Sequence, residues 1–293
     1  MQIDKSLRLL VTSECPYHCT YCHREGMRED FFELLDVNDY EFLMQLLKLK
    51  FGINKVSLSG GDPCGRKDIW EIGYAAKKLG LTCVVVTKGL LLKEIGMIDQ
   101  INFSIDTLNY NLYSKITGVK GKFLDKTITK VVEAKSKRLK VFINTVILEG
   151  INDDKKNFDE LLAFCSSHKV DEWRLVEKMD VDKPINMHNL YIEDYARKMG
   201  IKIDRLPGIQ KTFIYKEVPV TLYRCNCSAI WLAKRYIPES LFLSPDGNLL
   251  LCMRDDKKID LLTFIKNRDQ NSIVKIIKSI NFAKICPVLK RIR

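Results

Sequence analysis

Long apolar runs are missing from this sequence: no stretch approaches the ~20 residues that a membrane-spanning helix needs. The first fourteen residues, MQIDKSLRLLVTSE, carry charges throughout and have no apolar core, so they do not resemble a secretory signal. Internal repeats and low-complexity linkers are missing too, which excludes a repeat architecture. We therefore expect a cytoplasmic protein without a membrane partner, whose thiols stay reduced.

The ten cysteines are then not expected to form a disulfide framework. Three of them, Cys15, Cys19 and Cys22, fall within eight positions of the stretch SECPYHCTYCHREG. Reduced cysteines that cluster in this way are typical of metal or cluster ligands, or of catalytic thiols. The stretch therefore becomes the first candidate site.

The formal net charge of +11 indicates an anionic partner. The basic residues are scattered, however, and no basic stripe interleaved with aromatic residues stands out. This distribution favours a phosphorylated small molecule over a nucleic acid.

Strand and helix patterns alternate over the first 180 residues, which predicts an α/β fold with a parallel sheet and right-handed crossovers. We expect six strand–helix units in a sheet that is open or partly closed, a partial (β/α)6 TIM-like barrel. The predicted strands span 6–14, 55–63, 82–89, 100–106, 140–150 and 172–179, and the helices 38–51, 68–79, 122–138 and 153–168.

The pattern changes after about residue 180, so we divide the chain into a core (1–182) and an α+β extension (183–293) that packs on the barrel. The extension contains a short helix near 190–200 and a final helix near 269–284. Between them lie the strand-like pieces KTFIYK, VPVTLYRC and ESLFLSPDGNLLLCM, the last a hairpin that turns at SPDG.

Unusual residues follow the predicted core strands where each strand ends. Parallel sheets of this kind bind ligands beyond the carboxyl ends of their strands. The cysteine loop, SGGDP, TKG and SID follow strands one to four, and Asn144 and Arg174 lie on strands five and six. We therefore expect one site at this rim.

The spacing C-x3-C-x2-C supplies three thiolates. A [4Fe–4S] cluster has four irons, so three thiolates leave one iron open for a substrate or cosubstrate. Zinc is the main alternative, with His18 or His23 as a fourth ligand, although both lie so close to the cysteines that tetrahedral closure is cramped. Three incidental buried cysteines are the remaining alternative.

The motif C-x3-C-x-aromatic-C after a first strand resembles the signature loop of radical S-adenosylmethionine (SAM) enzymes, with Tyr21 as its aromatic residue. The resemblance implies that SAM chelates the open iron. One electron from the cluster, which a low-potential donor supplies, then cleaves SAM to methionine and a 5′-deoxyadenosyl radical, which abstracts a hydrogen atom. The protein's part is binding and orientation.

Other rim residues also match SAM-contacting positions of this superfamily. SGGDP resembles its G-G-E-P motif with Asp for Glu, and TKG resembles its T-N-G with Lys88 for Asn. The SAM-binding residues implied in this way are Gly60, Gly61, Asp62, Pro63, Thr87, Ser104, Asn144 and Met179.

The segments LRLLVTSEC, INFSIDTLNYNLYSKITG, VFINTVILEGIND and WRLVEKMDV resemble the GTP 3′,8-cyclase branch, which begins molybdenum cofactor biosynthesis. This resemblance implies a second [4Fe–4S] cluster on Cys225, Cys227 and Cys252, whose open iron binds the purine of GTP. Zinc or an empty site are the alternatives, and Cys286 is a substitute ligand. Cys64, Cys83 and Cys165 are interpreted as packing residues.

The same resemblance implies that Arg8 and Arg174 face the triphosphate or the reaction centre, and that Arg66 and Lys67 belong to the phosphate site. The sequence departs from the branch in its C-x-C spacing, in the inserted SAIWLAKRYIPESLF, in a missing arginine pair after the second cysteine and in its ending, CPVLKRIR, in place of a Gly-Gly tail. Another nucleotide, a nucleoside or a peptide is therefore the alternative substrate. A non-catalytic iron–sulfur or zinc scaffold is the alternative from a different class.

Overall fold

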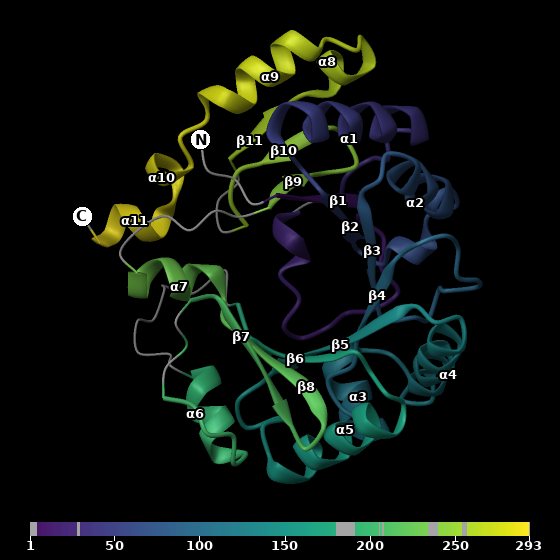
Figure 1. Ribbon diagram of the computed structural model, residues 1–293, viewed down its shortest axis with the longest axis vertical. Coiled ribbons are helices and arrows are strands. Elements are labelled where there is room, and N and C mark those ends of the chain that lie inside the picture. The colour runs from purple at the N-terminus through teal and green to yellow at the C-terminus, as the bar shows by residue number, and fades with distance from the viewer. Residues whose placement is uncertain are drawn as a thin grey trace.

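The computed structural model describes residues 5–27, 30–179, 191–204, 206, 208–233, 240–253 and 257–292. Within these ranges one sheet of eleven strands runs in the order β11-β10-β9-β1-β2-β3-β4-β5-β6-β8-β7. The sheet curls into an open barrel with helices on its outer side, and the purple segment that follows β1 lies inside the curve (Figure 1). None of the described helices is long and apolar enough to cross a bilayer.

Six parallel strands form the middle of the sheet, each paired with the next along the chain. The prediction of six parallel core strands is confirmed, with each strand ending two or three residues earlier than expected. They are β1 (Ser6–Thr12), β2 (Lys55–Gly60), β3 (Thr82–Thr87), β4 (Gln100–Ser104), β5 (Lys140–Ile147) and β6 (Glu172–Glu177).

The helices of the core cover the outer face of these strands (Figure 1). Four predicted helices are present, and α1 shows why: a capping box between Asp36 and Asp39 begins it, and Gly52 ends it in the left-handed conformation. The helices are α1 (Val37–Phe51), α2 (Ile69–Lys78), α3 (Tyr110–Thr117), α4 (Phe123–Ser136) and α5 (Lys155–Ser167).

The prediction of six strand–helix alternations is wrong in one connection, because residues 88–99 between β3 and β4 form no helix. A Cβ atom at Gly96 would lie 2.8 Å from the Trp70 ring, so this backbone packs directly on α2. Leu92, Ile95 and Ile98 are buried, so this segment covers the outer face of the sheet in place of a helix. The opposite error concerns α3, which was not predicted.

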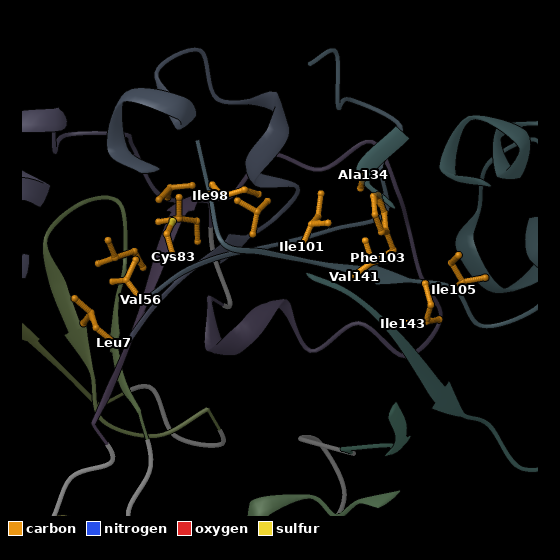
Figure 2. Packing of buried hydrophobic residues seen from close by; sticks show 14 of the residues in the cluster. Leu7, Val56, Cys83, Ile98, Ile101, Phe103, Ile105, Ala134, Val141 and Ile143 are labelled. Carbon is orange, nitrogen blue, oxygen red and sulfur yellow. The ribbon is translucent and has the colours of Figure 1, made fainter. Parts of the chain in front are cut away.

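Buried and half-buried side chains alternate along the strands, which separates a buried outer face from the face that lines the barrel lumen. On β5, Val141 and Ile143 are buried, whereas Phe142 and Asn144 on the other face are only half-buried. Figure 2 shows the outer set, in which side chains from neighbouring strands pack against Ile98 and Ala134. Each such side chain contributes about 1.5–3 kcal/mol by leaving water.

The C-terminal part extends both edges of this sheet. β8 (Val218–Tyr223) runs parallel to β6 and forms a hairpin with β7 (Gln210–Tyr215). β9 (Leu241–Leu243) runs parallel to β1 and forms with β10 (Asn248–Leu250) the predicted hairpin, with Gly247 at φ 86° in its turn. β11 (Lys258–Asp260) completes the edge. The predicted boundary near residue 182 lies outside the described residues.

Two short elements and six further helices complete the described chain. The predicted final helix is broken at Asn281, which caps a new helical turn, so α9 is followed by α10 and α11. The elements are η1 (Arg24–Gly26), η2 (Pro63–Gly65), α6 (Tyr191–Lys198), α7 (Asn226–Ala233), α8 (Leu262–Lys266), α9 (Gln270–Ser279), α10 (Phe282–Ile285) and α11 (Pro287–Ile292).

Helices α7 and α11 meet where the two ends of the sheet approach each other. Ile230 of α7 packs with Val288 and Leu289 of α11 in a small apolar cluster separate from the main core. Since α7 follows β8 and α11 belongs to the chain after β11, this contact bridges the open side of the barrel (Figure 1).

Candidate active site

The loop after β1 carries the first three cysteines and is anchored by α3. Two amides of the loop donate to the last carbonyls of that helix: His18 N to Thr117 O (2.9 Å) and Thr20 N to Ile116 O (2.9 Å). Cys15 and Cys22 are exposed and Cys19 is half-buried. Helix α3 therefore holds the backbone of the cysteine loop in place, a role that could not be predicted from its short sequence.

The three thiols are close enough to influence one another's protonation. Burial raises the pKa of Cys19 to about 12, with Lys88 opposing this shift and Cys15 and Cys22 adding to it. Burial thus favours the neutral thiol of Cys19, and a cysteine gives up its proton when it binds a metal. Among the described residues no three Cys, His, Asp or Glu side chains converge on a single metal ion, whereas the thiolates of a [4Fe–4S] cluster each bind a different iron.

The GGDP segment lies directly beside the cysteine loop. Gly61 N donates to Thr12 O and Asp62 N donates to Glu14 O, both at 2.8 Å. A Cβ atom would lie 2.0 Å from Glu14 O at Gly61 and 2.3 Å from Thr12 O at Gly60, which also has φ 120°. Only glycine permits this approach. The glycine pair thus couples the second strand end to the backbone immediately before Cys15.

Asp62 follows the glycines and has one carboxylate oxygen without a partner. Its Oδ1 accepts from Thr87 Oγ1 (2.7 Å) and from Cys64 N (3.2 Å), while burial raises the pKa of the carboxyl group. Oδ2 is buried with no hydrogen-bond partner in the described structure, and the same holds for Asn144 Oδ1 on β5. Buried acceptors are normally satisfied, so both atoms are suited to a ligand's donors. The residues present therefore fit a ligand that carries an ammonium group and hydroxyl groups, as SAM does.

A polar row crosses the barrel wall at the level of Asn144. Ser104, Asn144, Arg174 and Thr221 are direct register partners on β4, β5, β6 and β8. The guanidinium of Arg174 stacks 4.4 Å from the centre of the Phe142 ring, which holds it against the wall.

Glu172 holds this arginine from the side. Its Oε1 accepts from Arg174 Nε (2.6 Å) and from Thr221 Oγ1 (2.8 Å). The guanidinium is thus held by its Nε and by its stacked face. An arginine fixed in this way loses little entropy when its remaining donors bind an anion.

Arg8 enters the lumen from β1. Its Nη1 donates to Glu25 Oε1 (2.8 Å), which also accepts from Ser59 Oγ (2.7 Å), and its guanidinium lies 5.6 Å from the Phe242 ring centre. Burial disfavours its charge, but Glu25 and Tyr223 of β8 outweigh this and raise the pKa of Arg8. Its buried Nε has no partner among the described residues. Arg8 therefore retains a donor for a ligand.

Arg66 makes a different set of contacts from those expected of a phosphate ligand. Its donors go to Val11 O (2.8 Å), Leu35 O (2.7 Å) and both carboxylate oxygens of Asp68, and the side chain is buried. It fastens β1 and the segment before α1 to the start of α2, which accounts for its charge without a phosphate. Lys67 beside it is exposed.

Two other predicted residues lie at the rim without a distinctive contact. Pro63 begins η2 and is buried, and Met179 lies two residues beyond the end of β6 and is half-buried. Their predicted part in SAM binding rests on the resemblance.

Lys88 proves to be the buried cation of the site. Its Nζ donates to Asp106 Oδ2 (3.0 Å) and to the hydroxyl of Tyr21 (3.2 Å), and Tyr21 in turn donates to Asp106 (2.6 Å). The Tyr17 ring is a further neighbour, with its centre 5.8 Å from Nζ. The sequence VVVTKG showed that a lysine follows β3. Its partner Asp106, which follows β4, could not be identified from that stretch.

The C-terminal cysteines gather beside α7. Cys225 is buried just before the helix, and its amide donates to Glu177 Oε2 (2.8 Å). A hydrogen bond from the Cys227 thiol lowers the pKa of Cys225, against the effect of burial. Cys252 and Cys286 both line a pocket at the end of the β9–β10 hairpin. The structure thus places the predicted ligands and the substitute Cys286 in one corner of the molecule.

Comparison with known proteins agrees with this site. The model of the Radical SAM superfamily matches residues 9–162, more than half of the chain. A protein of Methanococcus aeolicus named "Probable GTP 3′,8-cyclase" is 29% identical over 292 residues, covering 90% of each chain. One of Pyrococcus abyssi with the same name is 30% identical, covering 89% of each chain.

Solved structures share the fold. SuiB of Streptococcus suis bound to S-adenosylmethionine covers 98% of this chain and 72% of its own, with a TM-score of 0.66 and 18% identity. The enzyme anSMEcpe with bound AdoMet covers 96% of this chain and 88% of its own, with a TM-score of 0.53 and 12% identity. These likenesses confirm the predicted α/β partial barrel. The chain therefore belongs to the radical SAM superfamily and is an enzyme that works with a [4Fe–4S] cluster and S-adenosylmethionine.

Proposed function

We propose that this enzyme abstracts a hydrogen atom from the ribose of a nucleotide held in the barrel lumen, and that the nucleotide is GTP, which it cyclises. The relatives named as GTP 3′,8-cyclases over nine-tenths of their length support the substrate. The observation that supports SAM binding is the pair of buried oxygens without a hydrogen-bond partner in the described structure, Asp62 Oδ2 and Asn144 Oδ1, which are suited to a ligand's donors.

The rim residues divide the work of holding the cosubstrate. When bound, the cluster supplies SAM with the electron that breaks its sulfonium into methionine and a 5′-deoxyadenosyl radical. Cys15, Cys19 and Cys22 provide the three thiolates. Asp62 Oδ2 and Asn144 Oδ1, both without a partner in the described structure, would accept from the ammonium group and the ribose of SAM respectively.

The two lumen arginines supply the substrate's anion site. Arg8 and Arg174 come from β1 and β6, which lie on opposite sides of the lumen, and each keeps donors beyond its carboxylate partner. Several cations are expected around a triphosphate of about four negative charges, and the net charge of +11 attracts it. Arg66 is left out of this group because its donors are occupied within the chain.

We also propose that a second [4Fe–4S] cluster forms on Cys225, Cys227 and Cys252. The placement of these residues supports this, because Cys227 packs against the apolar cluster that includes Cys286, and Cys286 lines one pocket with Cys252.

The test is turnover under strict anaerobic conditions. Reconstituted, reduced enzyme with SAM and GTP should form 5′-deoxyadenosine together with a cyclised pterin precursor. Arg174→Gln should raise KM for GTP about 10-fold to 100-fold through the loss of charge-assisted hydrogen bonds. The matched control Lys156→Gln alters an exposed charge on α5 and should change nothing. Deoxyadenosine formation that GTP neither stimulates nor turns into a modified nucleotide would rule GTP out.

A second candidate is a different substrate for the same radical chemistry. The residues after Cys227 are Ser228, Ala229 and Ile230, and the last packs into the apolar cluster with α11 instead of offering a cation to a nucleotide. Other nucleotides, nucleosides and peptides should therefore be screened by their acceleration of SAM cleavage. Stimulation by GTP alone would eliminate this candidate.

A further inference from the structure

We propose that Cys286 is the fourth protein ligand of the second cluster, so that this cluster has no open iron. The inference rests on the second cluster of the proposed function and deepens it. It assigns the cluster a closed coordination shell and leaves substrate binding to the side chains of the lumen.

Shared surroundings relate the four C-terminal cysteines to one another. Cys225 is buried directly before α7, and Cys227 lies in the first turn of that helix. Cys227 also packs against the small apolar cluster that includes Cys286. Cys286 and Cys252 in turn line the same pocket. The cysteines at the start of α7, in the loop after β10 and between α10 and α11 therefore lie in one corner of the molecule.

The backbone presents Cys286 at a break between two helices. Its amide donates to Phe282 O (2.9 Å) and closes α10, and Pro287 begins α11 directly after it. A proline at the first helical position fixes the direction of the new helix. The side chain is buried, and Ile230 of α7 packs in the same apolar cluster. The residue is held from both sides in a position that faces α7.

Burial alone is the simpler explanation, because unpaired cysteines are among the most buried residues. Cys83 and Cys165 fit that explanation, since both lie in the main core. The C-terminal set differs because four of the ten cysteines of the chain occupy one corner, beside a pocket. Four thiolates are the number that a fully ligated [4Fe–4S] cluster requires.

A closed cluster has two consequences for the enzyme. Its iron cannot bind the base of a nucleotide, so specificity must come from lumen residues such as Arg8, whose neighbour Phe242 also lines the pocket. The cluster would also fasten α7 to α11 across the open side of the barrel. Loss of Cys286 would then affect the second cluster without touching the rim thiols.

The experiment isolates the second cluster in a protein with Cys15, Cys19 and Cys22 replaced by Ala. After anaerobic loading we expect about four irons and four sulfides per chain. The electron paramagnetic resonance spectrum of the reduced protein should not change on addition of cyanide or GTP. Adding Cys286→Ala should open one iron, so that cyanide now shifts the spectrum. Cys165→Ala in the same background is the matched control and should behave like the parent.

A further variant gives a result even when the Cys286→Ala protein loses the whole cluster. Cys286→Ser offers an oxygen ligand and should retain iron with altered g values, whereas the Cys165→Ser control should keep the parent spectrum. The inference is wrong if the parent already responds to cyanide, if both Cys286 variants match the parent, or if the site holds zinc without sulfide. No outcome depends on turnover of GTP, so failure of that substrate would leave the result intact.

Discussion

Replacing Lys88 tests how much its buried ion pair with Asp106, beside the cysteine loop, contributes to the stability of the protein. Its ion pair with Asp106 is buried, with 10% of the lysine side chain and 1% of the aspartate side chain exposed. Lys88→Met would retain the packing of the aliphatic chain but leave a carboxylate unpaired in the interior. Removing one partner of a buried pair costs about 3–5 kcal/mol. With a urea slope of about 3 kcal/mol/M, the unfolding midpoint should fall by about 1–1.7 M.

The surface supplies a matched control for this measurement. Lys77 forms a similar ion pair with Asp99, but there both side chains are about one-third exposed. Exposed pairs contribute about 0–1 kcal/mol, so Lys77→Met should shift the midpoint by less than about 0.3 M. The double variant Lys88→Met/Asp106→Asn should recover part of the loss, since it removes the unpaired charge. Equal midpoints for the two single lysine variants would refute the reasoning.

Three further variants probe other parts of the account. Asp62→Asn should weaken SAM binding about 10-fold to 100-fold in calorimetry of cluster-loaded protein, because the ammonium group loses a charged acceptor. Gly61→Ala should lower iron loading, since its Cβ would meet Glu14 O, whereas Gly208→Ala, with open space around it, should load normally. Burial disfavours the Asp39 carboxylate, but its two cationic partners outweigh this and lower its pKa. Its stabilisation is therefore present above the unfolded pKa of about 3.9 and lost as pH falls through the folded value. Asp39→Asn should cost about 1–3 kcal/mol at pH 7, and urea midpoints should show the gap closing below pH 4.

The positions of the core strands could be predicted from the sequence because each strand carries its own signal. Buried parallel strands appear as apolar runs, and the connecting helices show helical periodicity. That pattern was enough to bring the cysteine loop, Asp62 and Asn144 to one rim. The packing of 88–99 could not be predicted, because it depends on the close approach of Gly96 to Trp70, a contact between distant segments.

The site residues also fall into those that could be predicted from the sequence and those that could not. Gly60 and Gly61 could be singled out from their motif, and the close backbone contacts give the physical reason. The contacts of a basic side chain, by contrast, depend on residues elsewhere in the chain. Arg66 follows the same motif but binds Leu35 O and Asp68, while Lys88 is held by Asp106. A sequence motif indicates where a charge lies along the chain but not which group neutralises it.

The most direct test of the central claim is SAM cleavage by anaerobically reconstituted, reduced enzyme. Wild-type protein should release 5′-deoxyadenosine and methionine, and Cys19→Ala should release neither and lose about four irons per chain. Cys83→Ala changes a buried cysteine of the main core and should retain both the iron and the cleavage. Cleavage that persists undiminished in Cys19→Ala, or wild-type protein that binds no sulfide and leaves SAM intact, would contradict the account.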